Sequence, residues 1–184
     1  MIVDIGGGTT EIAVMSLGGV VFSKSLRVAG DAMDSGIINY MRKKFNLLIG
    51  ESTAEKIKKE IGTAIPTSNN VFLMKGRDIR TGTPKEISLT EEDACEALMP
   101  ILSQMLAAIK EALENTPPEL SADLVDMGLV LTGGGALLKN IDKLISKDTG
   151  LPVTIADNPL ECVALGTGKA LENEELFSTM MSEY

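Results

Sequence analysis

Two triglycine turns, each following a short apolar segment, constrain this sequence more than any other feature. Gly6 to Gly8 follow residues 2–5, and Gly133 to Gly135 follow Thr132 and the apolar run 128–131. Glycine permits close approaches that a Cβ atom would forbid, so such turns can bring backbone amides up to an anion. We expect both turns to lie at strand ends, above a shared sheet, where they would shape a binding site.

The first 28 residues predict an antiparallel meander. Alternating or apolar runs at 2–5, 11–16 and 20–28 predict three strands, joined by the first triglycine turn and by a hairpin at Gly18. From Asp31 the apolar period becomes helical, and Asp31 is placed to cap that helix.

The stretch 31–90 predicts a small inserted α+β subdomain. Ser52 and Glu55 have the spacing of a capping box at the start of a second helix. Residues 71–79 and 85–89 alternate around Gly82 and predict a hairpin.

The remaining chain alternates helices and strands. Thr90 is placed to cap a long helix that Pro100 should kink or restart and that two prolines at 117 and 118 should end. After the strand at 128–131, the second triglycine turn should open a helix that closes at Gly150. A strand at 152–155 and a helix at 159–171 follow, and the acidic tail after residue 172 should fray.

This order predicts an α/β fold in which a ribonuclease-H-like domain with a mixed sheet carries an insertion. Its two parts are residues 1–30 and 91–184, and the inserted subdomain spans 31–90. At 184 residues and 44% hydrophobic composition, the chain can bury the core that this arrangement requires.

Composition excludes several classes of function. Seventeen basic against 26 acidic residues give a net charge of -9, which argues against nucleic acid as a partner. The chain has no histidine, which removes His-dependent nucleophilic catalysis and His-ligated zinc. Cys95 and Cys162 lie in apolar helical patterns, and we interpret them as core residues of a reduced, cytoplasmic protein.

The first triglycine turn combines an acid with free backbone amides. Asp4 ends the preceding strand and is suited to hold Mg²⁺, directly or through water, while Thr9 and Thr10 add hydroxyl donors beside the glycines. A glycine hairpin with a capping aspartate explains the same residues without a ligand.

The second turn strengthens the phosphate-binding interpretation because it also follows a strand. Gly133, Gly134, Gly135, Ala136 and Leu137 would present amides and the positive end of a helix dipole. On the second helix, Glu55 and Lys58 share a face, and from the residues alone they are a cap and a solvated charge.

Several segments resemble a known family. Residues 4–11 are similar to the second phosphate loop of the actin, sugar kinase and heat-shock chaperone superfamily, and residues 131–138 to its adenosine loop. Within it the chain resembles the bacterial rod-shape proteins of the MreB family, from residue 2 to about residue 172. The further matching segments are residues 27–31, 37–40, 46–51, 116–120 and 163–168.

The resemblance implies ATP with Mg²⁺, filament formation at the inner face of the cytoplasmic membrane and guidance of cell-wall synthesis. Asp4 would orient the metal, and Glu11 would help order water for slow hydrolysis. The residues from Gly6 to Thr10 would cradle the β- and γ-phosphates. The adenosine end would contact Glu55, Lys58 and the residues from Gly133 to Leu137.

The sequence begins at the second phosphate loop, whereas relatives carry a preceding half with a first phosphate loop and the membrane-binding segment. We therefore expect this chain to bind ATP weakly and to hydrolyse it negligibly. The implied partners are further copies of the protein, the cell-elongation machinery and a membrane-bound adaptor such as RodZ, with the membrane surface reached only through the absent half.

Two alternatives stay open at this point. A sugar- or acid-kinase-like phosphotransferase would share the same loops, but it needs a substrate-binding acid that the sequence does not reveal. A nucleotide-independent docking domain would use the subdomain that holds the adenosine loop.

Overall fold

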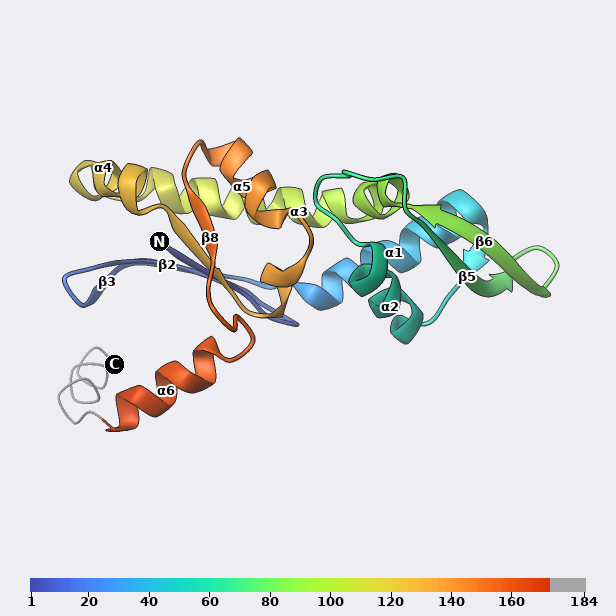
Figure 1. The fold of residues 1–184 in the computed structure, drawn as a ribbon, viewed down its shortest axis with the longest axis horizontal. Coiled ribbons are helices and arrows are strands. Elements are labelled where there is room, and N and C mark those ends of the chain that lie inside the picture. Colours follow the sequence, from blue (N-terminus) through green and yellow to red (C-terminus); the bar gives the residue numbers. More distant parts are fainter. Residues whose placement is uncertain (173–184) are drawn as a thin grey trace.

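The computed structural model describes residues 1–172, and the fraying expected after residue 172 concerns residues outside that range. The molecule is elongated, with a five-stranded sheet at one end and a three-stranded sheet at the other (Figure 1). The long helix α3 (Glu91–Glu114) runs between the two ends. Among the described residues, no helix is both long and apolar enough to cross a bilayer.

The larger sheet is mixed, as predicted, with the order β3-β2-β1-β7-β8. Its first three strands form the antiparallel meander, and the remaining pairs are parallel. Its strands are β1 (Ile2–Ile5), β2 (Thr10–Ser16), β3 (Gly19–Leu26), β7 (Leu129–Thr132) and β8 (Val153–Ile155).

The parallel pairing of β1 with β7 brings the two triglycine turns together. Asp4 lies opposite Thr132 in this register, and each strand runs directly into its turn. Because the carboxyl ends of parallel strands lie at the same sheet edge, both turns leave the sheet side by side. The expectation that they share one edge of one sheet is confirmed.

Helix α3 covers one face of this sheet, where alternate residues of β1 and β2 such as Val3, Ile5 and Ile12 are buried. Thr90 forms the predicted cap: its hydroxyl accepts from the Asp93 amide, and the Asp93 carboxylate accepts from the Thr90 amide. The restart considered at residue 100 does not occur, because α3 is unbroken. Buried residues on both sides of the proline hold the two halves against one core.

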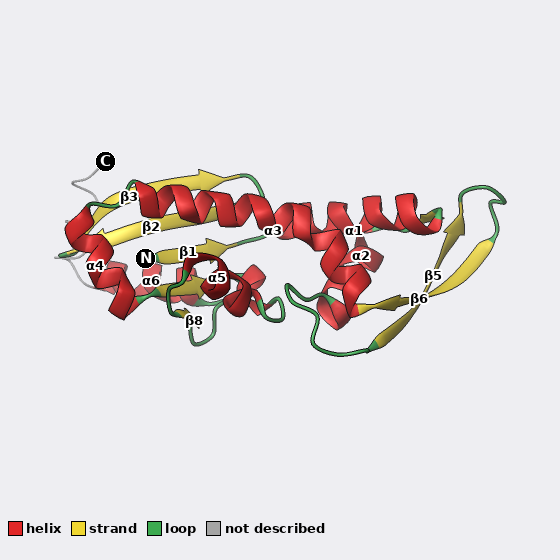
Figure 2. Ribbon diagram, turned by 90° about the horizontal axis from the view of Figure 1, so that it is seen from above, coloured by secondary structure: helices red, strands yellow, loops and turns green. Residues whose placement is uncertain are grey.

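The smaller sheet has the order β4-β5-β6 and includes the predicted hairpin. The two-residue strand β4 was not predicted, because its leucines continue the preceding helical pattern. The elements of this part are α1 (Gly30–Phe45), β4 (Leu47–Leu48), α2 (Glu51–Ile61), β5 (Val71–Asp78) and β6 (Pro84–Thr90). Seen from above, β5 and β6 form a twisted ribbon beyond α2 (Figure 2).

Two predicted helix caps are wrong. Helix α1 starts one residue before Asp31, and its N-cap, Ala29, makes no side-chain capping bond. Helix α2 starts one residue before Ser52, with Gly50 as N-cap, so no capping box forms there. The carboxylate of Glu55 instead pairs with Lys59 at 2.7 Å, one helical turn further on.

The region after α3 also departs from expectation. The prolines end α3, but they then open a further helix, α4 (Pro118–Met127), since proline fits the first turn of a helix, where no amide partner is needed. The single helix predicted after the second turn is a 3₁₀ turn, η1 (Gly134–Leu137), followed by α5 (Ile141–Thr149). Asn140, in the left-handed conformation, separates them.

Helix α6 (Cys162–Glu172) follows β8 and extends away from the larger sheet (Figure 1). The prediction that both cysteines are core residues is wrong, because Cys95 and Cys162 are each only half-buried. Partial burial still raises the pKa of the Cys95 thiol, which disfavours the reactive thiolate.

The buried carboxylate of Glu91 ties the long α2–β5 connection to α3. It accepts hydrogen bonds from the amides of Thr67 and Ser68, at 2.9 and 3.0 Å, and from the Ser68 hydroxyl at 2.8 Å. These donors, the Thr67 amide first, lower the pKa of Glu91 below its ordinary value. A carboxylate with a lowered folded-state pKa stabilises the fold above its unfolded-state pKa, and this stabilisation is lost as the pH falls through the folded-state value.

We therefore expect Glu91→Gln to lower the free energy of unfolding at pH 7 by about 1.5 to 3 kcal/mol, the range for hydrogen bonds to a charged group. Denaturant titrations of both proteins should show this difference shrinking as the pH falls below about 4.3, the unfolded value for glutamate. A difference that is constant from pH 7 to pH 3 would contradict this role of the Glu91 charge.

Candidate functional site

The first triglycine turn exposes three consecutive backbone amides. The Gly6 amide donates to the Thr9 carbonyl at 2.9 Å, which closes the turn. Gly7, Gly8 and Thr9 are exposed, and no atom of residues 1–172 accepts a hydrogen bond from their amides. An array of this kind can bind an anion through the backbone alone.

Asp4 lies at the end of β1, beside these amides. The hydroxyl of Thr132, in β7, donates to Asp4 Oδ1 at 2.7 Å. This bond fixes the carboxylate at the junction of the two turns, and it comes from a residue that was not proposed as part of the site. The sequence contains the signal, a threonine directly before the second triglycine turn, but its partner is visible only once β1 and β7 pair.

The second turn packs directly on the end of β1. A Cβ atom on Gly133, whose φ is +78°, would lie 2.4 Å from the carbonyl oxygen of Ile5, and one on Gly135 would lie 2.2 Å from Ile5 Cγ2. Only glycine fits this approach. The second turn therefore packs against Ile5, the residue directly before the first turn.

The residues that follow present a short rather than a long helix. Gly134 and Leu137 are exposed at the surface of η1, while Ala136 is buried beneath them. Because η1 has four residues, the dipole of a long helix is not available here. This turn can therefore contribute only its own backbone groups to ligand binding.

Thr10 and Glu11, the first residues of β2, differ in what they offer. Thr10 is fully buried and its hydroxyl donates to the Val28 carbonyl at 2.7 Å, so that donor is already used. Glu11 is exposed, lies opposite Asp4 in the β1–β2 register and accepts a hydrogen bond from Ser25 at 2.7 Å. Two carboxylates thus lie beside the turn.

The start of α1 is joined to the first turn by two backbone bonds. The Gly30 amide donates to the Gly6 carbonyl at 3.1 Å, and the Asp31 amide donates to the Gly7 carbonyl at 2.8 Å. The Asp31 carboxylate lies near the turn, 3.6 Å from the position of a Cβ on Gly7. Sequence reasoning assigned Asp31 to helix capping and missed this position.

Glu55 and Lys58 on α2 are not equivalent. The Lys58 ammonium donates to the Gly30 carbonyl at 3.0 Å and to Asp34 at 2.8 Å, which connects it to the first turn through one residue. Glu55 is exposed and bonded to Lys59, which also lowers its pKa. Lys58 is thus linked to the first turn through Gly30, whereas Glu55 pairs with Lys59 on its own helix.

No group of three or more Cys, Asp or Glu side chains within residues 1–172 could by itself hold a metal ion. Mg²⁺ in nucleotide sites commonly takes one or two carboxylates and completes its shell with phosphate oxygens and water. Asp4, with one oxygen held by Thr132, is suited to the protein's share of that shell.

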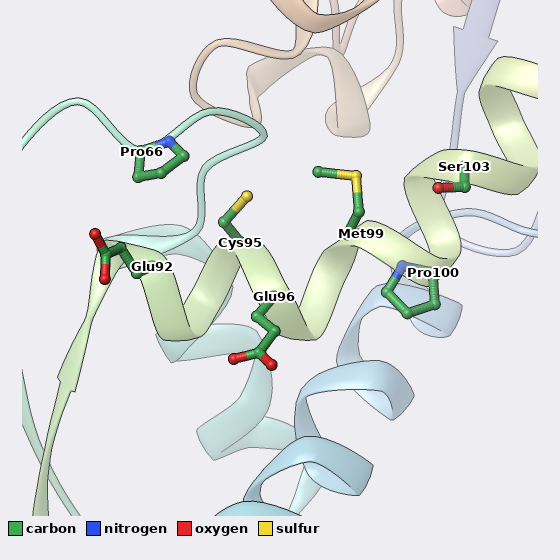
Figure 3. A pocket seen from close by; sticks show the side chains of 7 residues that line it. All are labelled: Pro66, Glu92, Cys95, Glu96, Met99, Pro100 and Ser103. Atoms are coloured by element: carbon green, nitrogen blue, oxygen red, sulfur yellow. The ribbon is translucent and has the colours of Figure 1, made fainter.

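A separate groove of about 500 Å³ runs along α3. Cys95 and Met99 project to one side of the helix, whereas Glu96 and Pro100 project to the other (Figure 3). The Glu96 carboxylate accepts from Tyr40 at 2.6 Å and from Lys44 at 2.9 Å. None of the lining residues comes from a triglycine turn, so this groove is not part of the site at the sheet edge.

The chain is similar in sequence to proteins of one known family. The family model described as "MreB/Mbl protein" matches residues 1–179. The cell shape-determining protein MreB of Escherichia coli (strain K12) is 51% identical over 173 residues, which cover 94% of this chain and 50% of that protein. The cell shape-determining protein Mbl of Bacillus subtilis (strain 168) is 47% identical over 174 residues, with coverages of 94% and 52%.

The chain also matches a solved structure of a protein from the same family. The crystal structure of MreB5 of Spiroplasma citri bound to AMPPNP matches with a TM-score of 0.91 and 39% identity, over 100% of this chain and 55% of that one. The chain spans about half the length of the curated relatives that it matches. With a mixed sheet whose order and turns fit an actin-like fold, the chain belongs to the MreB/Mbl family.

Proposed function

We propose that this chain forms the ATP-binding part of a filament-forming protein that determines rod cell shape by guiding cell-wall synthesis. The observation that carries the proposal is that both triglycine turns leave the sheet at the same β1–β7 edge, with the second turn packed on Ile5 and free amides on the first. The names of the relatives, "cell shape-determining", and the nucleotide in the structure of MreB5 support it.

In this proposal the first turn binds the β- and γ-phosphates through the amides of Gly7, Gly8 and Thr9, with Gly6 and Thr10 closing the turn on either side. Asp4 would hold Mg²⁺, directly or through water, and the metal would offset the phosphate charge. Hydrolysis would be slow, because it relies on positioning and on water ordered near Glu11, with no covalent intermediate.

The adenosine end would lie along the second turn and α2. The exposed backbone of Gly134 and Leu137 flanks it on one side, while Glu55 and Lys58 approach it from α2. The ammonium of Lys58 has three protons and uses two of them within the protein, which leaves one for a ligand.

We also propose residues 31–90 as a subdomain inserted into a ribonuclease-H-like domain made of 1–30 and 91–184. Longitudinal contacts between copies would build the filament, which would work in the cytoplasm at the inner face of the membrane. A membrane-bound adaptor such as RodZ and the cell-elongation machinery would be its partners.

For the chain of 184 residues alone, we expect weak binding of MgATP, with a dissociation constant on the order of 1 mM, and negligible hydrolysis. The carboxylates of Asp4, Glu11 and Asp31 lie around the turn and repel an uncompensated polyphosphate. Titration followed by the NMR shifts of the Gly7, Gly8 and Thr9 amides measures the affinity, and phosphate release measures turnover. Submicromolar binding with sustained turnover would show that this expectation is wrong.

The metal role of Asp4 has its own test. In the unchanged chain, Mg²⁺ should strengthen ATP binding about tenfold. Asp4→Asn should remove most of this gain, since the neutral amide lacks the negative charge that attracts the cation. Asp123→Asn, an exposed carboxylate on α4, is the control and should keep the full gain. If ATP binding by the two variants depended equally on Mg²⁺, Asp4 would not be the residue that holds the metal. Partner binding that survives substitution of Asp4 and Gly134 would instead favour the docking-domain alternative.

A further inference from the structure

Lys58 and Asp34 form a partly buried ion pair between α2 and α1. Lys58 Nζ lies 2.8 Å from Asp34 Oδ2 and 3.0 Å from the Gly30 carbonyl oxygen, and the two side chains are 18% and 15% exposed. Asp34 Oδ1 is buried, and none of the described residues donates to it. Within the described residues, Lys58 is the only one that forms an ion pair with this carboxylate.

Gly30 connects this pair to the phosphate-binding turn. Its carbonyl accepts from Lys58, while its amide donates to the Gly6 carbonyl at 3.1 Å. A Cβ on Gly30 would lie 3.3 Å from the Gly6 oxygen and 3.5 Å from Gly7 Cα, so the segments are already in close contact. A shift of Gly30 would therefore displace the turn.

The other end of the connection lies in the small sheet unit. Helix α2 buries Ala54, Ile57 and Ile61 and contacts β5, α1 and α3. Lys58 thus lies on a helix that packs against α1, α3 and the three-stranded sheet, and its head group bonds to Gly30, which is hydrogen-bonded to the first triglycine turn.

We propose that Asp34 is a positioning residue that holds Lys58 against the Gly30 carbonyl and thereby couples the position of α2 to the geometry of the Gly6–Gly8 turn. A charged partner aims the ammonium more strongly than a carbonyl alone. The link is intramolecular and exists without nucleotide. Its effect on ATP rests on the function proposed above.

An interhelical ion pair elsewhere in the molecule provides a matched control. Lys110 on α3 lies 2.9 Å from Asp148 on α5, with 50% and 30% of the side chains exposed. Neither side chain forms a hydrogen bond or an ion pair with a triglycine turn. Loss of this pair should affect local stability without affecting the Gly30 and Asp31 amides.

The test is amide hydrogen exchange, measured by NMR on the full chain without nucleotide. The reporters are the amides of Gly30 and Asp31, which donate to the turn, each compared with amides of the β5–β6 ladder in the same sample. Asp34→Asn and Lys58→Met should each speed exchange of the reporters about tenfold relative to the ladder, as expected for a local opening. The double variant should be no faster than either single variant, whereas Lys110→Met should leave the reporters unchanged.

Lys58→Arg, which keeps the charge, should retain part of the protection, and it serves as the readout if Asp34→Asn does not fold. Three results would overturn the proposal: unchanged reporters, reporters and ladder amides that speed up equally, or effects of the two substitutions that multiply in the double variant.

Adding MgATP separates this inference from the proposed function. If both hold, Asp34→Asn weakens MgATP binding several-fold and Lys110→Met does not. If no form of the chain binds MgATP while the exchange results stand, the coupling remains and the nucleotide function fails. If the unchanged chain binds MgATP and Asp34→Asn binds it equally well despite faster exchange, the coupling has no role in binding and that part of the inference is rejected.

Discussion

The parallel pairing of β1 with β7 is the interaction on which the rest of the structure depends. It joins the first strand of the chain to one that lies more than 120 residues later, and its register places Asp4 opposite Thr132. The pairing brings the two glycine turns to one edge and lets Thr132 orient the Asp4 carboxylate. It also requires glycine at 133 and 135, because the second turn packs against the backbone and side chain of Ile5. A one-residue slip would move Asp4 to the other face of the sheet and separate these groups.

Much of this arrangement could be predicted from local patterns. Alternating apolar residues identify the meander and the hairpin of the small sheet, and Thr90 with its helical run identifies α3. The glycine turns stand out because few other residues fit such geometry. The resemblance of both turns to superfamily loops indicates the superfamily, and the further matching segments indicate the family to which the chain belongs.

What could not be predicted depends on contacts between distant residues. Asp31 and Ser52 have the residue type and spacing of caps, yet both helices begin earlier, where Gly30 packs against the turn and Gly50 opens α2. The hydroxyl of Thr10 was expected to face a ligand and donates instead to Val28. Nothing in the sequence indicates that Lys58 reaches back to Gly30 and Asp34, since this contact depends on how α1 and α2 pack.

The separation between Asp4 and Thr132 has a consequence for how the protein folds. The hydrogen bond between them spans 128 positions, and contacts of such high sequence separation form slowly because a long loop must close first. During synthesis the meander emerges before β7, so the edge of β1 that later pairs with β7 has no neighbour until β7 leaves the ribosome. For that interval the nascent chain carries an open strand edge, the feature that most readily recruits other chains. Pairing with β7 closes this edge, so the register that sets Asp4 opposite Thr132 also protects the growing polypeptide from aggregation.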